Sequence, residues 1–473
     1  MRLHVCIHRA TCAWAIVLGL VVLVMASPTH AQPVDIPATW GGDVASRPRL
    51  TGSWGGLRDD LGKKGVVLDV DLLQTLQGVA SGGRDEVATY WGLAEYTLNV
   101  DTQKLGLWPG GFLRVQGQSS FGQNVNHASG ALLSPNMISL LPQPGETTSA
   151  LENLTFMQFF SKHFGVIVGK ISLLGGDDNA FAHDYHTTFM NSALDFNLAL
   201  ALAPFTAYGG GFVILPWDGA VFTVMALDPS GAATNNDLSD AFKDGALVAA
   251  EGRVTITPFG LVGHQLLGGV WSNKERFSLE QDPSNLSRLL RTKQSSRLAD
   301  PGPGLERILA RFFPSLLVPT QPINRVNYTW SVYYNFDQYL WSPAGAPDRG
   351  IGVFFRFGAS DGVANPIKYA YNVGIGGKGL VPGRPCDTFG IGWARTELSG
   401  NFVPFLRQQL RLGLGHEDAI ELYYTAAITP WFSAALDLQI IDQALERTLD
   451  ASGSRLRDVN TAVVLGLRIY SRF

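Results

Sequence analysis

The sequence predicts an all-β fold, a transmembrane antiparallel β-barrel, on three observations. Apolar and polar residues alternate with a period of two over many stretches of about ten residues, which is the pattern of barrel strands. No segment after residue 31 reaches the ~20 consecutive apolar residues of a spanning helix. The 53 glycines exceed the usual share of ~7%, as tight turns and bulges require. Since lipid leaves no backbone polar group unpaired, a chain that crosses it without such helices must close into a barrel.

The stretch 463–473 shows the alternation most clearly. One face is apolar and ends in an aromatic residue, whereas the other carries two arginines. Such a strand fits a wall between lipid and water. An edge strand of a soluble sheet is the alternative. We expect Phe473, the aromatic residue that ends the sequence, to act as a signal for assembly in the outer membrane of a Gram-negative bacterium. The apolar face holds Val463, Leu465, Leu467, Ile469, Ser471 and Phe473, and the opposite face holds Val464, Gly466, Arg468, Tyr470 and Arg472.

Elsewhere the polar face of the alternating stretches keeps carrying ionisable and amide side chains. A dry core between two sheets would not tolerate so many of them, whereas a water-filled lumen would. Glu251 and Arg253 are spaced i, i+2, which places both side chains on one face of a strand. For each such residue, a structural ion pair or a solvated wall position is the alternative to contact with a solute. The residues that we expect to line the lumen are Trp91, Glu95, Arg114, Glu251, Arg253, Arg356, Asp437 and Gln439.

The beginning of the sequence predicts export. Residues 1–31 combine basic residues, an apolar run and a small-residue site at Ala31, as a cleaved signal peptide does; an uncleaved anchor is disfavoured because the run is too short to span. Residues 32–65 should form a lead-in and a short helix that Ser53 caps and Gly65 ends. The barrel should then occupy residues 66–473.

Charge and cysteine content exclude several classes of protein. The formal net charge of −4 becomes −6 without residues 1–31, because Arg2 and Arg9 leave, which argues against a nucleic-acid partner. Cys386 is the single cysteine after residue 31, so neither an internal disulfide nor a cysteine-based metal centre is expected. His183 and His186 lack a suitably spaced third ligand. We expect no metal, no cofactor and no catalytic residues.

Residues 284–313 interrupt the alternating pattern. Their leucines recur at roughly helical spacing and their arginines outnumber the acidic residues. We expect a basic, partly helical insert in a long loop, either solvated outside the barrel or folded over the pore.

Four stretches resemble the carbohydrate-selective porin family of the OprB type, and they occur in the family's order over nearly the whole exported chain. They are Leu50-Thr51-Gly52-Ser53-Trp54-Gly55-Gly56-Leu57-Arg58; Gly169-Lys170-Ile171-Ser172-Leu173-Leu174 with residues 179–184 and 189–191; residues 376–385; and residues 421–439 around Thr429-Pro430-Trp431. The resemblance implies 16 strands, long extracellular loops, and passive, selective passage of carbohydrates into the periplasm. It also adds Lys170 to the pore-lining residues.

The partners implied are sugars or other small solutes, outer-membrane lipid and the barrel-assembly machinery, with a monomer or a homotrimer as the assembly. Two alternatives stay open. One is a porin-like channel for other small solutes such as organic acids, which the basic insert suggests. The other is an outer-membrane enzyme or adhesin.

Overall fold

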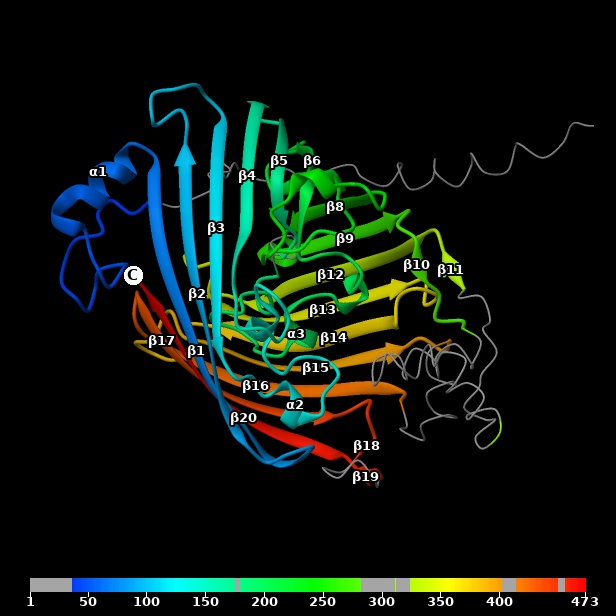
Figure 1. The fold of residues 1–473 in the computed structure, drawn as a ribbon. Helices are drawn as coiled ribbons and strands as arrows, with labels where there is room; N and C mark the ends of the chain where they lie inside the picture. The colour runs from blue at the N-terminus through cyan, green and yellow to red at the C-terminus, as the bar shows by residue number, and fades with distance from the viewer. Residues whose placement is uncertain (1–35, 175–178, 282–310, 312–323, 402–413, 450–455) are drawn as a thin grey trace, which may run out of the picture.

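The barrel closes on itself. The structure, a computed structural model, describes residues 36–174, 179–281, 311, 324–401, 414–449 and 456–473. Among these residues, sixteen antiparallel strands pair in sequence order and the last pairs with the first (Figure 1). The predicted fold class is therefore confirmed. The strands are β1 (Val66–Gly83), β2 (Ala88–Asp101), β3 (Gly111–Gly122), β4 (Ser149–Ser161), β5 (Phe164–Ser172), β6 (Thr206–Ile214), β7 (Ala220–Leu227), β8 (Leu247–Ile256), β9 (Gly263–Ser272), β12 (Thr329–Trp341), β13 (Gly350–Ser360), β14 (Ile367–Lys378), β15 (Thr388–Leu398), β16 (His416–Thr429), β17 (Phe432–Asp442) and β20 (Asn460–Arg472).

Short helices, 3-10 turns and small β-ladders lie outside the sixteen strands of the barrel. Two small ladders stand apart from the barrel: β10 (Arg276–Phe277) with β11 (Arg325–Val326), and β18 (Arg447–Leu449) with β19 (Leu456–Asp458). The helices are α1 (Leu57–Lys63), α2 (Asn126–Ser129) and α3 (Ser192–Asp195), and the 3-10 turns are Trp54–Gly56, Met137–Leu140, Leu198–Leu200, Leu238–Asp240 and Pro258–Gly260.

Within the described part of the chain, no helix is both long and apolar enough to cross a membrane.

The two ends of the barrel differ. At one end the connections are short, as between Ser161 of β4 and Phe164 of β5, and α1 lies there beside the end of β20 (Figure 1). At the other end the connections are longer, as between Ser172 of β5 and Thr206 of β6. We call these the short-turn end and the long-loop end.

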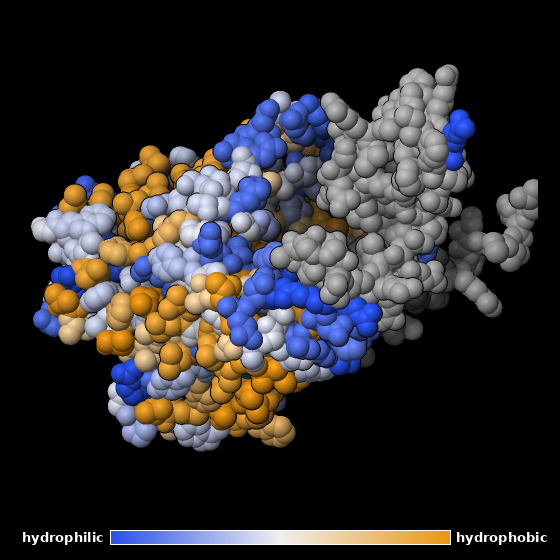
Figure 2. Space-filling view, turned by 60° about the horizontal axis from the view of Figure 1, so that its bottom comes forward, coloured by the Kyte–Doolittle hydropathy of each residue, from blue (hydrophilic) through white to orange (hydrophobic). Residues whose placement is uncertain are grey.

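The two faces of the wall follow the predicted alternation. On β20, Leu465 and Leu467 are exposed on the outside, whereas Val464 and Arg468 are buried on the inside. Apolar side chains cover much of the outer wall (Figure 2). The outside is therefore suited to lipid, and the polar groups of the wall face inward.

The short helix forms where it was expected, with one correction. Asp59 and Asp60 lie in the first turn of α1, and Gly65 follows the helix with φ +76°. Ser53 does not cap the helix with its hydroxyl, so that prediction was wrong. Gly55 and Gly56 have positive φ and separate Ser53 from α1, so its main-chain oxygen accepts the hydrogen bonds from the amides of Gly56 and Arg58 instead.

Two predicted segments lie largely or wholly outside the described residues. Residues 1–31, the expected signal peptide, are one of them. The basic insert at 284–313 is the other, where the structure describes Arg311 alone.

Candidate functional site

A long connection folds into the barrel. Residues 179–205, which precede β6 and which we call the inserted loop, bind inward-facing side chains from strands on several sides of the wall. Asn179 donates to Asn335 Oδ1 on β12 at 2.8 Å, and Asn372 on β14 donates to the carbonyl of Ala193 at 2.8 Å. Tyr185 donates to Glu95 on β2 at 2.8 Å. Contacts with β2, β12 and β14 together place the loop inside the lumen.

The apolar side of the inserted loop packs against β13–β16. Phe181, Phe189 and Leu194 are at most 2% exposed and form one cluster with Phe354 and Tyr423 of the wall. Glycines on the inner face make room for them. A Cβ atom at Gly376 would lie 2.6 Å from Cβ of Phe181, and one at Gly392 would lie 2.7 Å from Cδ2 of Leu194. The loop and the wall are thus fitted to each other.

Two buried arginines bind the loop through its carbonyl groups. Arg468 on β20 is 2% exposed and donates to the carbonyls of Tyr185 at 2.8 Å and Thr188 at 2.7 Å. Arg356 on β13 is 1% exposed and donates to the carbonyls of Ala182 and Leu194. A guanidinium offers five donors in a fixed plane, so one side chain can bind two carbonyls of a turn.

A carboxylate and an amide complete the attachment. Glu421 on β16 accepts hydrogen bonds from the amides of Met190 at 2.5 Å and Asn191 at 2.9 Å. Gln439 on β17 accepts from the side chain of Asn191 at 3.0 Å and donates to Asp437 at 2.8 Å. Buried backbone groups need such partners, because an N–H or C=O group that loses its hydrogen bonds to water on burial and finds no new partner destabilises the folded loop.

A second connection, residues 123–148, covers the inserted loop and the neighbouring wall; we call it the covering loop. The amide of Met137 donates to the carbonyl of Met190 at 2.6 Å, which joins the two loops. Trp91 on β2 donates to the carbonyl of Ile138 at 3.1 Å, and Gln439 donates to that of Pro135 at 2.8 Å. The two loops are thus bound to β1, β2, β12–β17 and β20, and they narrow the lumen along these strands.

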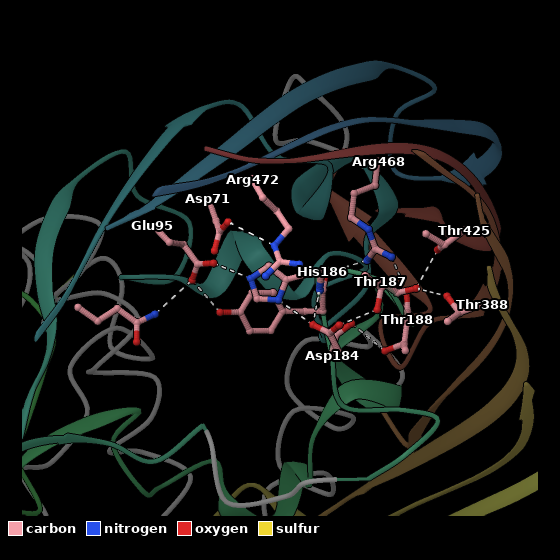
Figure 3. Close-up of polar contacts among 12 residues, drawn as sticks. Asp71, Glu95, Asp184, His186, Thr187, Thr188, Thr388, Thr425, Arg468 and Arg472 are labelled. Carbon is pink, nitrogen blue, oxygen red and sulfur yellow. Dashed lines mark hydrogen bonds and ion pairs between the residues drawn. The ribbon is translucent and has the colours of Figure 1, made fainter. Parts of the chain in front are cut away.

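His186 of the inserted loop joins two carboxylates (Figure 3). Its Nε2 lies 2.6 Å from Glu95 and its Nδ1 lies 2.7 Å from Asp184. Burial alone would lower the pKa of His186, but the interactions with Tyr470, Glu95 and Asp184 outweigh it and raise the pKa well above its usual value. The ring is then a cation that ties the loop to β2.

Six of the nine predicted pore-lining residues are covered. Each is at most 5% exposed, and each has a hydrogen bond to a loop or to a neighbouring wall residue. In this arrangement a solute would reach them only if the loops moved. They are Trp91, Glu95, Lys170, Arg356, Asp437 and Gln439.

Lys170 occupies a position where the alternation is broken. Gly169 before it has φ +134°, a backbone conformation that residues with a side chain rarely adopt. Because this conformation interrupts the regular pleat, the face of the strand on which Lys170 lies could not be deduced from spacing. Its ammonium donates to the carbonyls of Ala233 at 2.6 Å and Asn235 at 2.9 Å, in the connection between β7 and β8. Lys170 therefore anchors a third connection.

The other three predicted residues remain accessible. Arg114 on β3 is exposed and donates to Gln116 at 3.1 Å. Glu251 and Arg253 on β8 are partly exposed, and Tyr333 on β12 donates to Glu251 at 2.7 Å. Unlike the six covered residues, these three therefore present exposed surface.

Sequence reasoning missed the two loops. The sequence indicates that their residues connect strands, but not that they fold into the lumen. The wall side chains that bind the loops have the polarity expected of residues in contact with water. One signal was present: glycines alternate along the inner faces of β14 and β15, at Gly374 and Gly376 and at Gly390 and Gly392. A strip of the inner wall without side chains indicates that another segment of the chain packs closely against it.

The described residues contain no group of three or more His, Cys, Asp or Glu side chains that could hold a metal ion. Cys386 is exposed and forms no disulfide.

Comparison with known proteins identifies relatives. The family model described as "Carbohydrate-selective porin, OprB family" matches residues 85–473. The high-pH structure of Pseudomonas putida OprB is 20% identical, covers 91% of this chain and 99% of its own, and superposes with a TM-score of 0.71. The low-pH structure of the same protein is 17% identical over the same shares, with a TM-score of 0.52. No curated protein sequence matches significantly.

These structural likenesses, at 20% identity or less, establish the fold alone, whereas the family model spans most of the chain. The closed barrel of sixteen strands agrees with both, and the family consists of channels rather than enzymes. The chain belongs to the carbohydrate-selective porin family of the OprB type, and it is an outer-membrane β-barrel porin.

Proposed function

We propose that carbohydrates cross this porin along the part of the lumen that the inserted and covering loops leave open, and that Arg114, Glu251 and Arg253 contact them. The observation that supports this is accessibility. These three are the predicted pore-lining residues that are not buried.

Their chemistry suits a sugar. Guanidinium groups donate several hydrogen bonds in fixed directions to hydroxyl oxygens, and the carboxylate of Glu251 accepts hydrogen bonds from hydroxyl groups. The hydrogen bond from Tyr333 orients that carboxylate. Passage requires contacts that are weak enough for release, and partly solvated side chains provide such contacts. No cofactor enters this scheme.

Measurement of sugar block on single channels in planar bilayers tests the proposal. Arg253→Ala should weaken the block by roughly 2–10-fold, since one hydrogen-bonding group contributes about 0.5–1.5 kcal/mol. It should also shift ion selectivity toward cations, because a positive charge leaves the wall.

Arg325→Ala is the matched control. It removes the same side chain from β11, where Arg325 pairs with Glu275 at 2.9 Å away from the barrel sheet. If Arg253→Ala and Arg325→Ala behave alike, Arg253 is a wall residue without a part in selection. Block by organic acids in place of sugars would favour the alternative solute class.

A further inference from the structure

The segment before the barrel is bound across the seam at which the barrel closes. We call residues 36–65 the N-terminal segment. The seam joins β1 to β20, whose residues 71 and 472 pair at the short-turn end. The amide of Leu50 donates to the carbonyl of Arg472 at 2.8 Å, and Trp431 donates to the carbonyl of Val44 at 2.6 Å. Figure 1 shows the segment and the end of β20 side by side.

Arg58 of α1 bridges the two strands of the seam. Its side chain is 2% exposed, and Nη2 alone lies 2.8 Å from the carbonyl of Leu68 and 2.7 Å from Asp69, both on β1. The same nitrogen lies 3.0 Å from the main-chain oxygen of Phe473, which directly follows β20. Arg58 thus contacts residues that are more than 400 positions apart in the chain.

Aromatic rings enclose the Arg58 guanidinium. Its central carbon lies 5.4 Å from the ring centre of Trp40 and 4.8 Å from that of Trp54. Both rings belong to the N-terminal segment. Aromatic faces attract a cation and exclude water from it, which strengthens its hydrogen bonds.

Arg49 attaches the segment to β1 a second time. Its guanidinium lies 2.9 Å from Asp69 and 2.6 Å from Asp71, and its side chain is 9% exposed. Removing a charge from water is costly unless it is paired, so this position is stable because β1 supplies two carboxylates.

The binding surface for the segment is therefore composite. Asp69 and Asp71 of β1 form one half, and the main-chain oxygens of Arg472 and Phe473 form the other. The two halves lie side by side only when β20 has paired with β1. A segment that met β1 alone would leave donors of Leu50 and Arg58 without these acceptors.

We propose that the N-terminal segment docks only after β20 has paired with β1 and the barrel has closed, and that it then stabilises the pairing of these two strands. This function concerns the barrel itself and is independent of the solute that the channel passes.

Hydrogen exchange on the folded, full-length protein in detergent tests the holding role. Arg58→Ala should speed exchange at the seam by tenfold or more, above all at the amide of Phe473, which donates to Val70 at 2.8 Å. The amides that join β12 to β13 should change by less than about twofold, since cooperative units open separately.

Lys63→Ala is the matched control on the same helix, because Lys63 is largely exposed and its ion pair, at 3.4 Å, is with Asp60 of α1 itself. Seam exchange in Arg58→Ala that stays at the Lys63→Ala level would overturn the proposal. So would an equal rise at β12 and β13, which indicates global loosening. If Arg58→Ala does not accumulate, Asp69→Asn is measured against the same two outcomes.

Refolding of the unaltered protein tests the order of events. Protection of the N-terminal segment from a protease that cleaves after Lys and Arg should appear no earlier than the compact, heat-modifiable form of the barrel. Protection that precedes the compact form would show that the segment docks before closure, and would refute the closure dependence.

Discussion

Replacement of Arg468 by methionine should release part of the inserted loop from the wall. Arg468 is 2% exposed, and its guanidinium binds the carbonyls of Tyr185 and Thr188, on either side of the turn that carries His186 (Figure 3). Methionine keeps much of the side-chain length and adapts to irregular space, so the change removes the donors more than the packing.

The magnitude follows from the two lost hydrogen bonds. A hydrogen bond from a charged donor contributes about 1.5–3 kcal/mol, so the pair contributes roughly 3–6 kcal/mol. Other contacts stay, since Thr388 and Thr425 both donate to the carbonyl of Thr187 at 2.8 Å. We therefore take the lower value, about 3 kcal/mol, which corresponds to roughly a hundredfold increase in the time that the turn spends detached.

Single-channel recording in a planar bilayer detects this detachment as current flicker and a higher mean conductance. Arg114→Met is the matched control, because it removes the same charge from an exposed residue that donates to Gln116 on its own strand. Equal flicker in the two variants would refute the assignment of Arg468 as an anchor of the loop, since charge loss alone would then explain the change.

Three further predictions concern the loop, its pH dependence and assembly. Gly376→Ala should displace Phe181, whose Cβ would lie 2.6 Å from the new methyl group, and should destabilise the inserted loop by about 1–3 kcal/mol. The current flicker of this variant is compared with that of Gly400→Ala, where a Cβ meets nothing within 4 Å. The raised pKa of His186 means that its stabilisation of the loop is complete below the unfolded value of about 6.5 and is lost as pH rises through the higher folded pKa. In alkaline solution the amides of residues 184–188 should therefore lose protection relative to the exchange rate of an unfolded chain at the same pH, and His186→Gln should remove that pH-dependent loss. Phe473→Ala should lower the amount assembled in cells while refolding into detergent proceeds; an unchanged cellular amount would contradict a role in assembly.

The period-two pattern predicted the barrel and the two faces of its wall. On β20 it placed Leu465 and Leu467 outside and Arg468 inside, as the structure has them. Alternation is a local property of a strand, so it can be read from neighbouring residues. It assigned no face to Lys170, because the positive φ at Gly169 interrupts the alternation there.

What covers an inward-facing side chain is not a local property. Glu421 and Arg356 lie more than 150 residues from the amides and carbonyls that they bind, and nothing in their own strands indicates those partners. Their polarity was therefore interpreted as contact with water or with a solute. In this barrel the same polar groups bind the backbone of a loop. Sequence spacing alone does not distinguish a side chain that binds backbone from one that contacts water or a solute.

The size of the barrel explains why so many wall charges bind loops. Sixteen strands enclose a lumen wide enough for an aqueous channel, and a wide channel does not select among small solutes. A loop must narrow it, and a loop inside the lumen brings backbone donors and acceptors that need partners. Arginines satisfy its carbonyls and Glu421 satisfies its amides. On this argument the buried Arg356 and Arg468 hold the loop that narrows the path, and we propose that a sugar meets the more exposed Arg114 and Arg253.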